Sequence, residues 1–200
     1  MDVVSVVCVL KEGGAFNAEH ALTLKEQVGK NLSVPYQFIC LSDRNIQDEK
    51  PLLNNYPKWW SKIEAFRITG AVIYLDLDTS VFNSINSLAE SIVSEKQQNI
   101  SCLYMLRTFQ KTEKWSSTVM AWSGNWRWLY DEFAAGTDMT KYGYDQRYLI
   151  AKMEEKNKPI IAVQSLIRGT VWCSKHHTPT EEEIKRRNIT ICCFHNRAKK

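Results

Sequence analysis

The feature that most constrains the fold is an apolar run that ends in two acidic residues. Residues 71–75 read Ala-Val-Ile-Tyr-Leu, and Asp76, Leu77 and Asp78 follow at once. Such a run of β-branched and aromatic residues favours a buried strand, and open α/β sheets bind ligands beyond the carboxyl ends of their strands. Two carboxylates this close repel each other, which favours a divalent cation that would in turn hold phosphates. The alternative is a solvated turn that happens to carry two acids.

Regular elements are expected before this strand. In order, they are a strand at 3–10, a helix from 18 to about 30, a strand at 36–41 and a helix at 61–69. Asn17 can cap the first helix, while Ser61 and Glu64 have the spacing of a capping box for the second. Ala18, Ala21, Leu22 and Val28 are expected near one face of the first helix. This β-α-β-α-β order predicts a parallel sheet with right-handed crossovers.

The second half of the chain is less regular. Helices are expected at 87–96, 126–135 and 145–155, strands at 101–106, 118–122, 159–163, 170–173 and 189–194, and another capping box at Thr180 and Glu183. The whole pattern predicts a single α/β domain with a mixed, mainly parallel sheet flanked by helices. Residues 1–75 would form a nucleotide-binding half and residues 76–200 a metal and acceptor half. The chain stops after a strand and a basic tail, so we expect a larger parent protein.

Composition and charge narrow the classes of function. The formal net charge is +4, without the concentrated basic stripe of a nucleic-acid-binding protein. No apolar run has the length of a membrane span, and the N-terminus lacks the basic start of a signal peptide. We therefore expect a cytoplasmic protein that binds no nucleic acid. The six cysteines contain no Cys-x-x-Cys pair and are expected to be reduced core residues.

Two basic segments could serve a phosphate-binding site. His195 could add an imidazole ligand to the cation held by the acidic pair, which favours manganese over magnesium, and Lys199 could neutralise a diphosphate. The alternative is a frayed basic terminus. Lys62 is expected in the first turn of its helix, where amides and the helix dipole favour anions. It could reach a phosphate or a sugar hydroxyl, or it could be a solvated lysine beside structural tryptophans.

Polar segments in the second half could contact a sugar. Asp145 either caps its helix or faces an acceptor hydroxyl and helps to remove its proton. Two polar breaks next to strands, residues 116–118 and 172–176, could line a sugar pocket. Tryptophan often stacks on sugar rings beside such sites, although most of the tryptophans must belong to the core.

Taken together, these motifs resemble the GT-A class of nucleotide-sugar glycosyltransferases. The resemblance rests on the D-x-D motif at 76–78, on Trp-Trp-Ser-Lys at 59–62, on Tyr-Asp-Gln at 144–146 and on the ending at 193–199. That ending is similar to the F-H-G-x-P-K of the class, with Asn196 and Ala198 where Gly and Pro are usual. Within the class, the chain is most similar to amino-terminal domains of multidomain chlorovirus-encoded enzymes, which implies a location in the host cytoplasm.

The resemblance implies a Rossmann-like GT-A fold and a role in glycan biosynthesis. A hexosyl or deoxyhexosyl group would pass from a UDP-sugar to a hydroxyl of a glycan acceptor. Mn²⁺, with Mg²⁺ as a substitute, would be held by Asp76, Asp78 and His195. The residues expected around the donor are Leu10, Lys11, Gly13, Ser42, Asp43, Lys62, Asp76, Leu77 and Lys199. Those expected around the acceptor are Ser117, Asp145, Gln146 and Ser174.

The catalytic roles then follow from the charges that develop during transfer. The cation and Lys199 would stabilise the leaving diphosphate. Asp145 would act as the base if the anomeric configuration inverts, or would orient the substrate if it is retained. The sequence leaves both outcomes open.

Two other functions stay open as well. A haloacid-dehalogenase-type phosphatase has a similar acidic motif, in which Asp76 would attack phosphate and Asp78 would act as acid and base. That motif normally lies on the first strand of its domain, whereas two β-α units precede it here, and no later acidic pair completes a magnesium site. The other alternative is a non-catalytic module that binds a sugar or a nucleotide.

Overall fold

A mixed sheet of seven strands organises the structure. The computed structural model describes residues 3–44, 50–98, 101–108, 113–174 and 177–194. The strand order is β3-β2-β1-β4-β7-β6-β8. In chain order these strands are β1 (Val4–Leu10), β2 (Tyr36–Ser42), β3 (Lys50–Pro51), β4 (Val72–Leu75), β6 (Leu103–Arg107), β7 (Trp115–Trp122) and β8 (Ile160–Ala162).

The direction of the strands changes from one half of the chain to the other. Strand β1 pairs in parallel with both β2 and β4, as the β-α-β-α-β order predicts. Strand β7 then runs antiparallel to β4 and to β6, whereas β8 is again parallel to β6. The predicted α/β fold with a mixed, mainly parallel sheet is confirmed.

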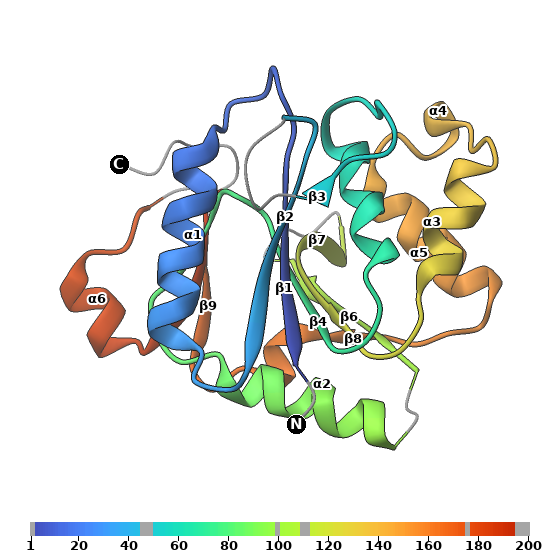
Figure 1. Ribbon diagram of the computed structural model, residues 1–200. Helices are drawn as coiled ribbons and strands as arrows, with labels where there is room; N and C mark the ends of the chain where they lie inside the picture. The colour runs from blue at the N-terminus through green and yellow to red at the C-terminus, as the bar shows by residue number, and fades with distance from the viewer. Residues whose placement is uncertain (1–2, 45–49, 99–100, 109–112, 175–176, 195–200) are drawn as a thin grey trace.

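Helices cover both faces of this sheet (Figure 1). They are α1 (Ala18–Asn31), the 3₁₀ helix η1 (Lys58–Arg67), α2 (Asn86–Gln97), α3 (Arg127–Ala134), α4 (Met139–Tyr142), α5 (Asp145–Glu155), the 3₁₀ helix η2 (Val163–Leu166) and α6 (Glu181–Arg186). Helices α1 and α2 pack on one face, and η1, α3 and α5 pack on the other. Within the described residues, no helix combines the length and the apolar character needed to cross a bilayer.

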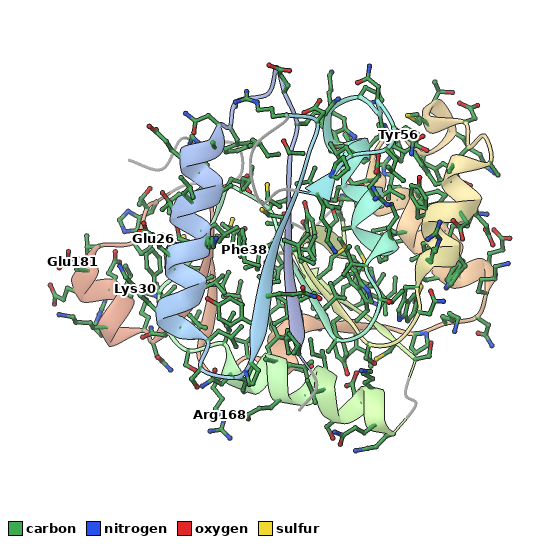
Figure 2. All side chains as sticks on the ribbon, in the orientation of Figure 1. Glu26, Lys30, Phe38, Tyr56, Arg168 and Glu181 are labelled. Carbon is green, nitrogen blue, oxygen red and sulfur yellow. The ribbon has the colours of Figure 1, made fainter. Side chains whose placement is uncertain are left out.

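The two faces of the sheet carry different cores. The face toward α1 is mostly aliphatic, and Leu24 is fully buried there, with Phe38 of β2 packed against the same cluster. The opposite face is aromatic: Phe133 of α3 contacts Tyr56 and Tyr148 through edge-on rings. Figure 2 shows Phe38 on the side of α1 and Tyr56 on the side of α3. Each buried ring contributes on the order of 1.5–3 kcal/mol of apolar burial, so the aromatic face gives η1 and α5 a rigid support.

A second, smaller sheet ties the end of the described chain to the acidic turn. Its order is β5 (Thr79–Val81), β10 (Ile189–Cys193) and β9 (Thr170–Cys173), with β10 antiparallel to β5 and parallel to β9. Directly beyond this pairing, the amide of Phe194 donates to the carbonyl of Asp78 at 2.8 Å. Strand β5 was not expected from the sequence, because three residues are too few to show the alternation of apolar and polar residues that indicates a strand.

The capping box expected at Ser61 and Glu64 is wrong. Helix η1 begins at Lys58, and the Ser61 hydroxyl donates to the carbonyl of Lys58 at 2.9 Å inside the helix. The Glu64 carboxylate is fully buried and accepts two backbone amides of the preceding loop, at 2.7 and 2.9 Å. These amides, together with the Arg67 guanidinium, bind the Glu64 carboxylate, so it does not cap the start of the helix. Lys62 therefore lies in the second turn of the helix.

Other local predictions fared better. Asn17 caps α1, and Thr180 with Glu183 forms a capping box at α6, as expected. Leu22, however, is 57% exposed, and Leu24 occupies the buried face instead. Residue 22 lies about 100° around the helix from residue 21, outside the stripe that faces the sheet. All six cysteines lie in the described part of the chain and are free, and five of them are buried.

Candidate active site

A cavity of about 900 Å³ opens beyond the carboxyl ends of β1 and β4. Its lining comes from segments within residues 11–16, 57–62, 74–78, 113–118 and 144–147, with further contributions from 9, 106, 108 and 173. Strands β1 and β4 are neighbours, so the loops that follow them open at the same edge of the sheet. The position matches the crevice in which open α/β sheets bind their ligands.

Lys62 is at the centre of the polar wall of this cavity. Its Nζ lies 2.9 Å from Asp76 Oδ2 and 3.6 Å from Asp145 Oδ2, and it donates to Ser117 Oγ at 3.2 Å. The four residues come from η1, the end of β4, the start of α5 and β7. One ammonium group thus joins four segments that are remote in the sequence.

The electrostatics of the cluster keep Lys62 charged. Burial alone would lower the pKa of its ammonium, but the attraction of Asp145 and Asp76, with a smaller part from Asp78, outweighs burial and raises it. A buried ammonium between carboxylates is a fixed positive charge in a medium of low dielectric constant. It therefore acts as a permanent electrostatic group and not as a base.

Asp76 is held from two sides. Lys62 contacts Oδ2, and the Tyr74 hydroxyl donates to Oδ1 at 2.7 Å. Burial and the neighbouring charge of Asp78 raise the pKa of the Asp76 carboxyl to about 6, although Lys62 and Tyr74 oppose this shift. Tyr74 was missed in the sequence analysis. Its spacing of two residues from Asp76 was the available signal, because alternate residues of a strand share a face.

Asp78 follows in a tight turn whose backbone is well fixed. The Asp76 amide donates to Thr118 of β7 at 2.9 Å, and the Thr79 amide donates back to the Asp76 carbonyl at 3.0 Å. The Asp78 side chain is buried and lines the cavity together with Leu77. Pairing on both sides of the turn thus presents the two carboxylates to one space.

Asp145 does not cap its helix. The cap position of α5 belongs to Tyr144, and Asp145 is the first helical residue, with its side chain buried at the cavity wall. Its carboxylate is turned toward Lys62. The helix dipole at this end of α5 also favours a negative charge. The arrangement leaves a fixed carboxylate facing the cavity.

The loop after β1 forms a further part of the cavity lining. Lys11 donates to the carboxylate of Asp43 and to Asn55 Oδ1, and the Glu12 amide also donates to Asp43. Burial would raise the pKa of the Asp43 carboxyl, but the hydrogen bonds from Lys11 and Glu12 lower it overall. Gly13 adopts a φ of 76°, a conformation that favours glycine, and lines the cavity. These contacts hold the loop in one conformation.

Of the remaining predicted site residues, only some line the cavity. Ser117 and Gln146 line the cavity, as do Lys11, Gly13, Lys62, Asp76, Leu77, Asp78 and Asp145. Leu10, Ser42, Asp43 and Ser174, which were expected at the site, do not, although Asp43 holds Lys11 of the lining. Leu10 packs into the aliphatic core, the Ser42 hydroxyl accepts the Arg44 amide, and Ser174 is fully buried with its hydroxyl on the Cys193 carbonyl. Local hydrogen bonds and core packing satisfy these side chains.

His195 and Lys199 lie outside the described residues. The last described residue, Phe194, is hydrogen-bonded to the backbone of Asp78. Their predicted roles as metal ligand and phosphate contact stay predictions.

The chemistry of the acidic wall fits a hard divalent cation. When ionised, Asp76, Asp78 and Asp145 carry three negative charges against one positive charge on Lys62. Carboxylate oxygens are the ligands that Mg²⁺ and Mn²⁺ prefer. Within the described part of the chain, no group of three or more His, Cys, Asp or Glu side chains could hold a metal. A cation at the Asp76–Asp78 pair would therefore need a further ligand from the undescribed tail or from a bound phosphate.

Comparison with known proteins bears on the fold. No protein-family model matches the chain, and no curated protein matches it. Its structure is similar to that of the glycosyltransferase GlyE of Streptococcus pneumoniae TIGR4, with a TM-score of 0.60 at 14% identity over 82% of this chain. The chain has a glycosyltransferase fold.

The similarity covers only part of the known enzyme. The match spans 46% of the GlyE chain, and the apo form of GlyE matches with a TM-score of 0.51 at 13% identity, over 83% of this chain and 42% of that one. This chain thus spans less than half of the length of the glycosyltransferase it resembles. At such low identity the likeness shows the shared fold alone.

Proposed function

We propose that this chain catalyses metal-dependent transfer of a sugar from a UDP-sugar to a hydroxyl group of a glycan. The observation that carries the proposal is the convergence of Lys62, Asp76 and Asp145 on one cavity beyond the carboxyl ends of β1 and β4. The glycosyltransferase fold supports it. A charged and mostly buried wall of this kind suits a reaction in which charge separates.

The donor nucleotide would lie at the end of the cavity formed by the loop after β1. Lys11 and Asp43 fix this loop by their ion pair, and Gly13 lets its backbone approach a ligand closely. The diphosphate would then extend toward Asp76 and Asp78. The sugar to be transferred would lie beside Asp145, at the far side of the cation site.

Asp76 and Asp78 would hold the cation, Mn²⁺ or Mg²⁺, and we assign His195 as the further protein ligand. The bound cation would supply Lewis-acid stabilisation of the leaving diphosphate. Lys199 would contact the same phosphates. Lys62 orients Asp76 through its 2.9 Å contact, so that the carboxylate is already positioned before the donor binds.

Transfer forms a bond between the acceptor oxygen and the anomeric carbon and breaks the bond from that carbon to the diphosphate, which takes the electron pair. The Asp145 carboxylate would accept a hydrogen bond from the acceptor hydroxyl and, in an inverting reaction, its proton. Lys62 keeps Asp145 in place and balances its charge. Gln146 and Ser117 would orient the sugar hydroxyls from the same wall.

The test measures turnover and binding separately. The protein is incubated with 5′-diphospho-sugars of uridine, guanosine and thymidine, with Mn²⁺ or with EDTA, and release of the nucleoside diphosphate is followed. We expect Mn²⁺-dependent release from UDP-sugars and a higher melting temperature when UDP and Mn²⁺ are both present. Phosphate release from p-nitrophenyl phosphate would favour the phosphatase instead. UDP binding without any turnover would favour the non-catalytic module.

A further inference from the structure

Two exposed aromatic rings lie together at the mouth of the cavity. Trp59 is 39% exposed and Tyr144 is 46% exposed, and among the described residues they are the only aromatic ones in the set of exposed large apolar side chains. Their ring centroids are 5.6 Å apart with an angle of 41° between the planes, and both residues line the cavity. Because exposed aromatic surface is unfavourable in water, a neighbouring pair in a cleft points to a ligand.

Each ring is carried by the same helix terminus as a charged residue of the site. Trp59 is near the start of η1, three residues before Lys62, and the next residue, Trp60, is buried against Phe133. Tyr144 is directly followed by Asp145. The buried residue of each helix fixes the direction of the exposed one, so the pair stands at a set position next to the proposed reaction centre.

Polar groups border the aromatic pair. The Arg147 guanidinium lies 5.3 Å from the centre of the Tyr144 ring and donates to Glu113 at 2.6 and 3.1 Å. The charge of Arg147 is thus already balanced by Glu113, while Gln146 adds an uncharged amide to the same edge of the cavity. Lys58 also lines the cavity, with its Nζ 5.4 Å from the centre of the Trp59 ring. A flat apolar surface with hydrogen-bonding groups at its border fits the face of a sugar ring.

We propose that Trp59 and Tyr144 form the binding subsite for a pyranose ring of the acceptor glycan. This inference rests on the proposed function, which places the nucleotide at the loop after β1 and the transferred sugar beside Asp145. Tyr144 directly precedes Asp145, so an acceptor ring stacked on the aromatic pair would have its hydroxyls close to Asp145. One face of the pyranose, rich in C–H groups, stacks on the rings, and Arg147 and Gln146 bind its hydroxyls.

The experiment measures binding of simple glycosides and needs no turnover. The probes are the methyl α- and β-glycosides of glucose, galactose, xylose, rhamnose and fucose, with methyl glucuronide as the anionic counterpart, in the presence of UDP and Mn²⁺. Binding is followed by saturation-transfer NMR and by acrylamide quenching of tryptophan fluorescence. All seven tryptophans lie in the described residues; Trp59 is the most exposed of them, while Trp115, Trp128 and Trp172 are half-buried. The part of the quenching that is lost in Trp59→Ala therefore reports on this subsite.

We expect at least one glycoside to bind and to protect Trp59 from acrylamide. Trp59→Ala and Tyr144→Ala should each lower the affinity for that glycoside about tenfold, whereas Tyr144→Phe should retain most of the affinity because the ring remains. Leu22→Ala removes a comparably exposed apolar side chain on α1, away from the cavity, and serves as the matched control.

Several results would overturn the inference. They are failure of every glycoside to bind the wild-type protein, or equal loss of affinity in Leu22→Ala. An equal loss of UDP affinity in Trp59→Ala would indicate collapse of the whole cavity and would also overturn it. Failure of the proposed function is distinguishable, because UDP and Mn²⁺ would then neither bind nor raise the melting temperature of the wild-type protein.

Discussion

The cavity has two unlike walls. The inner wall is buried and charged, with Lys62 held between Asp76 and Asp145, whereas the mouth is exposed and aromatic, with Trp59 beside Tyr144. Both walls take residues from the starts of η1 and α5, and the inner wall adds Asp76 from the end of β4. Neighbouring residues of one helix therefore serve opposite environments.

The difference between the walls shows that residues which stabilise the fold are separate from residues which bind a ligand. Buried charges interact strongly and leave little freedom, so the inner wall is fixed before any ligand arrives. Exposed rings gain little from the folded state and are free to gain from a ligand. Substitutions in the inner wall should thus affect folding and chemistry, and substitutions at the mouth should affect binding alone.

The largest effect is expected at Lys62. Lys62→Met leaves three carboxylates without their shared cation, and we expect the free energy of unfolding to fall by about 3 kcal/mol, as for other broken buried pairs. Urea unfolding at pH 7 measures this. Lys58→Met, at an exposed lysine four residues earlier in the same helix, should change it by less than about 0.5 kcal/mol. If both variants lost a similar free energy of unfolding, the buried inner wall would contribute no more to stability than the exposed part of the cavity.

The next effect concerns Asp145. Asp145→Asn preserves the shape of the side chain and removes its charge, and we expect kcat to fall on the order of a hundredfold or more with a small change in KM for the donor. Steady-state kinetics with a UDP-sugar measures both constants. An unchanged kcat would remove Asp145 from the chemistry and reduce the inner wall to a structural role.

Asp78 tests the cation without removing Lys62. In Asp78→Ala we expect UDP binding to lose its response to Mn²⁺ while the fold is kept, because one of the two proposed carboxylate ligands is gone. Calorimetric titration with UDP, with and without Mn²⁺, measures this, and circular dichroism checks the fold. Retained Mn²⁺-dependent binding would contradict the assignment.

The smallest effect belongs to the ion pair at the nucleotide end. The pKa of Asp43 is lower in the folded protein than its ordinary value of 3.8, so its ionised form stabilises the fold above that pH. At pH 7 the free energy of unfolding of the wild type should exceed that of Asp43→Asn by about 1 kcal/mol or less. This difference should disappear as the pH falls through the pKa that Asp43 has in the folded protein. Denaturation from pH 7 to pH 3 measures the difference. A difference that stays constant with pH would exclude this origin.

Local patterns in the sequence predicted much of the fold. The strand before Asp76 and the helix capped by Asn17 were recognisable because an apolar run and a capping residue act within a few positions. The predicted start of η1 was wrong, since Glu64 binds two amides of the preceding loop and the Arg67 guanidinium and not the amide of a capping residue. The expectation that Leu22 shares the buried face of its helix was wrong, because the side of a helix that is buried depends on which side packs against the sheet.

The sequence predicted which types of residue lie at the candidate site, but only some of the contacts between them. The sequence by itself determined that a buried strand delivers two acids to the ligand-binding edge of an α/β sheet, because alternation, apolar runs and turn residues act locally. Tertiary structure alone decided that Lys62 meets Ser117, 55 residues away, that Asp145 faces inward, and that two of the aromatic residues stay exposed. The physical reason is that burial and ion pairing depend on which segments pack together, which no local pattern specifies.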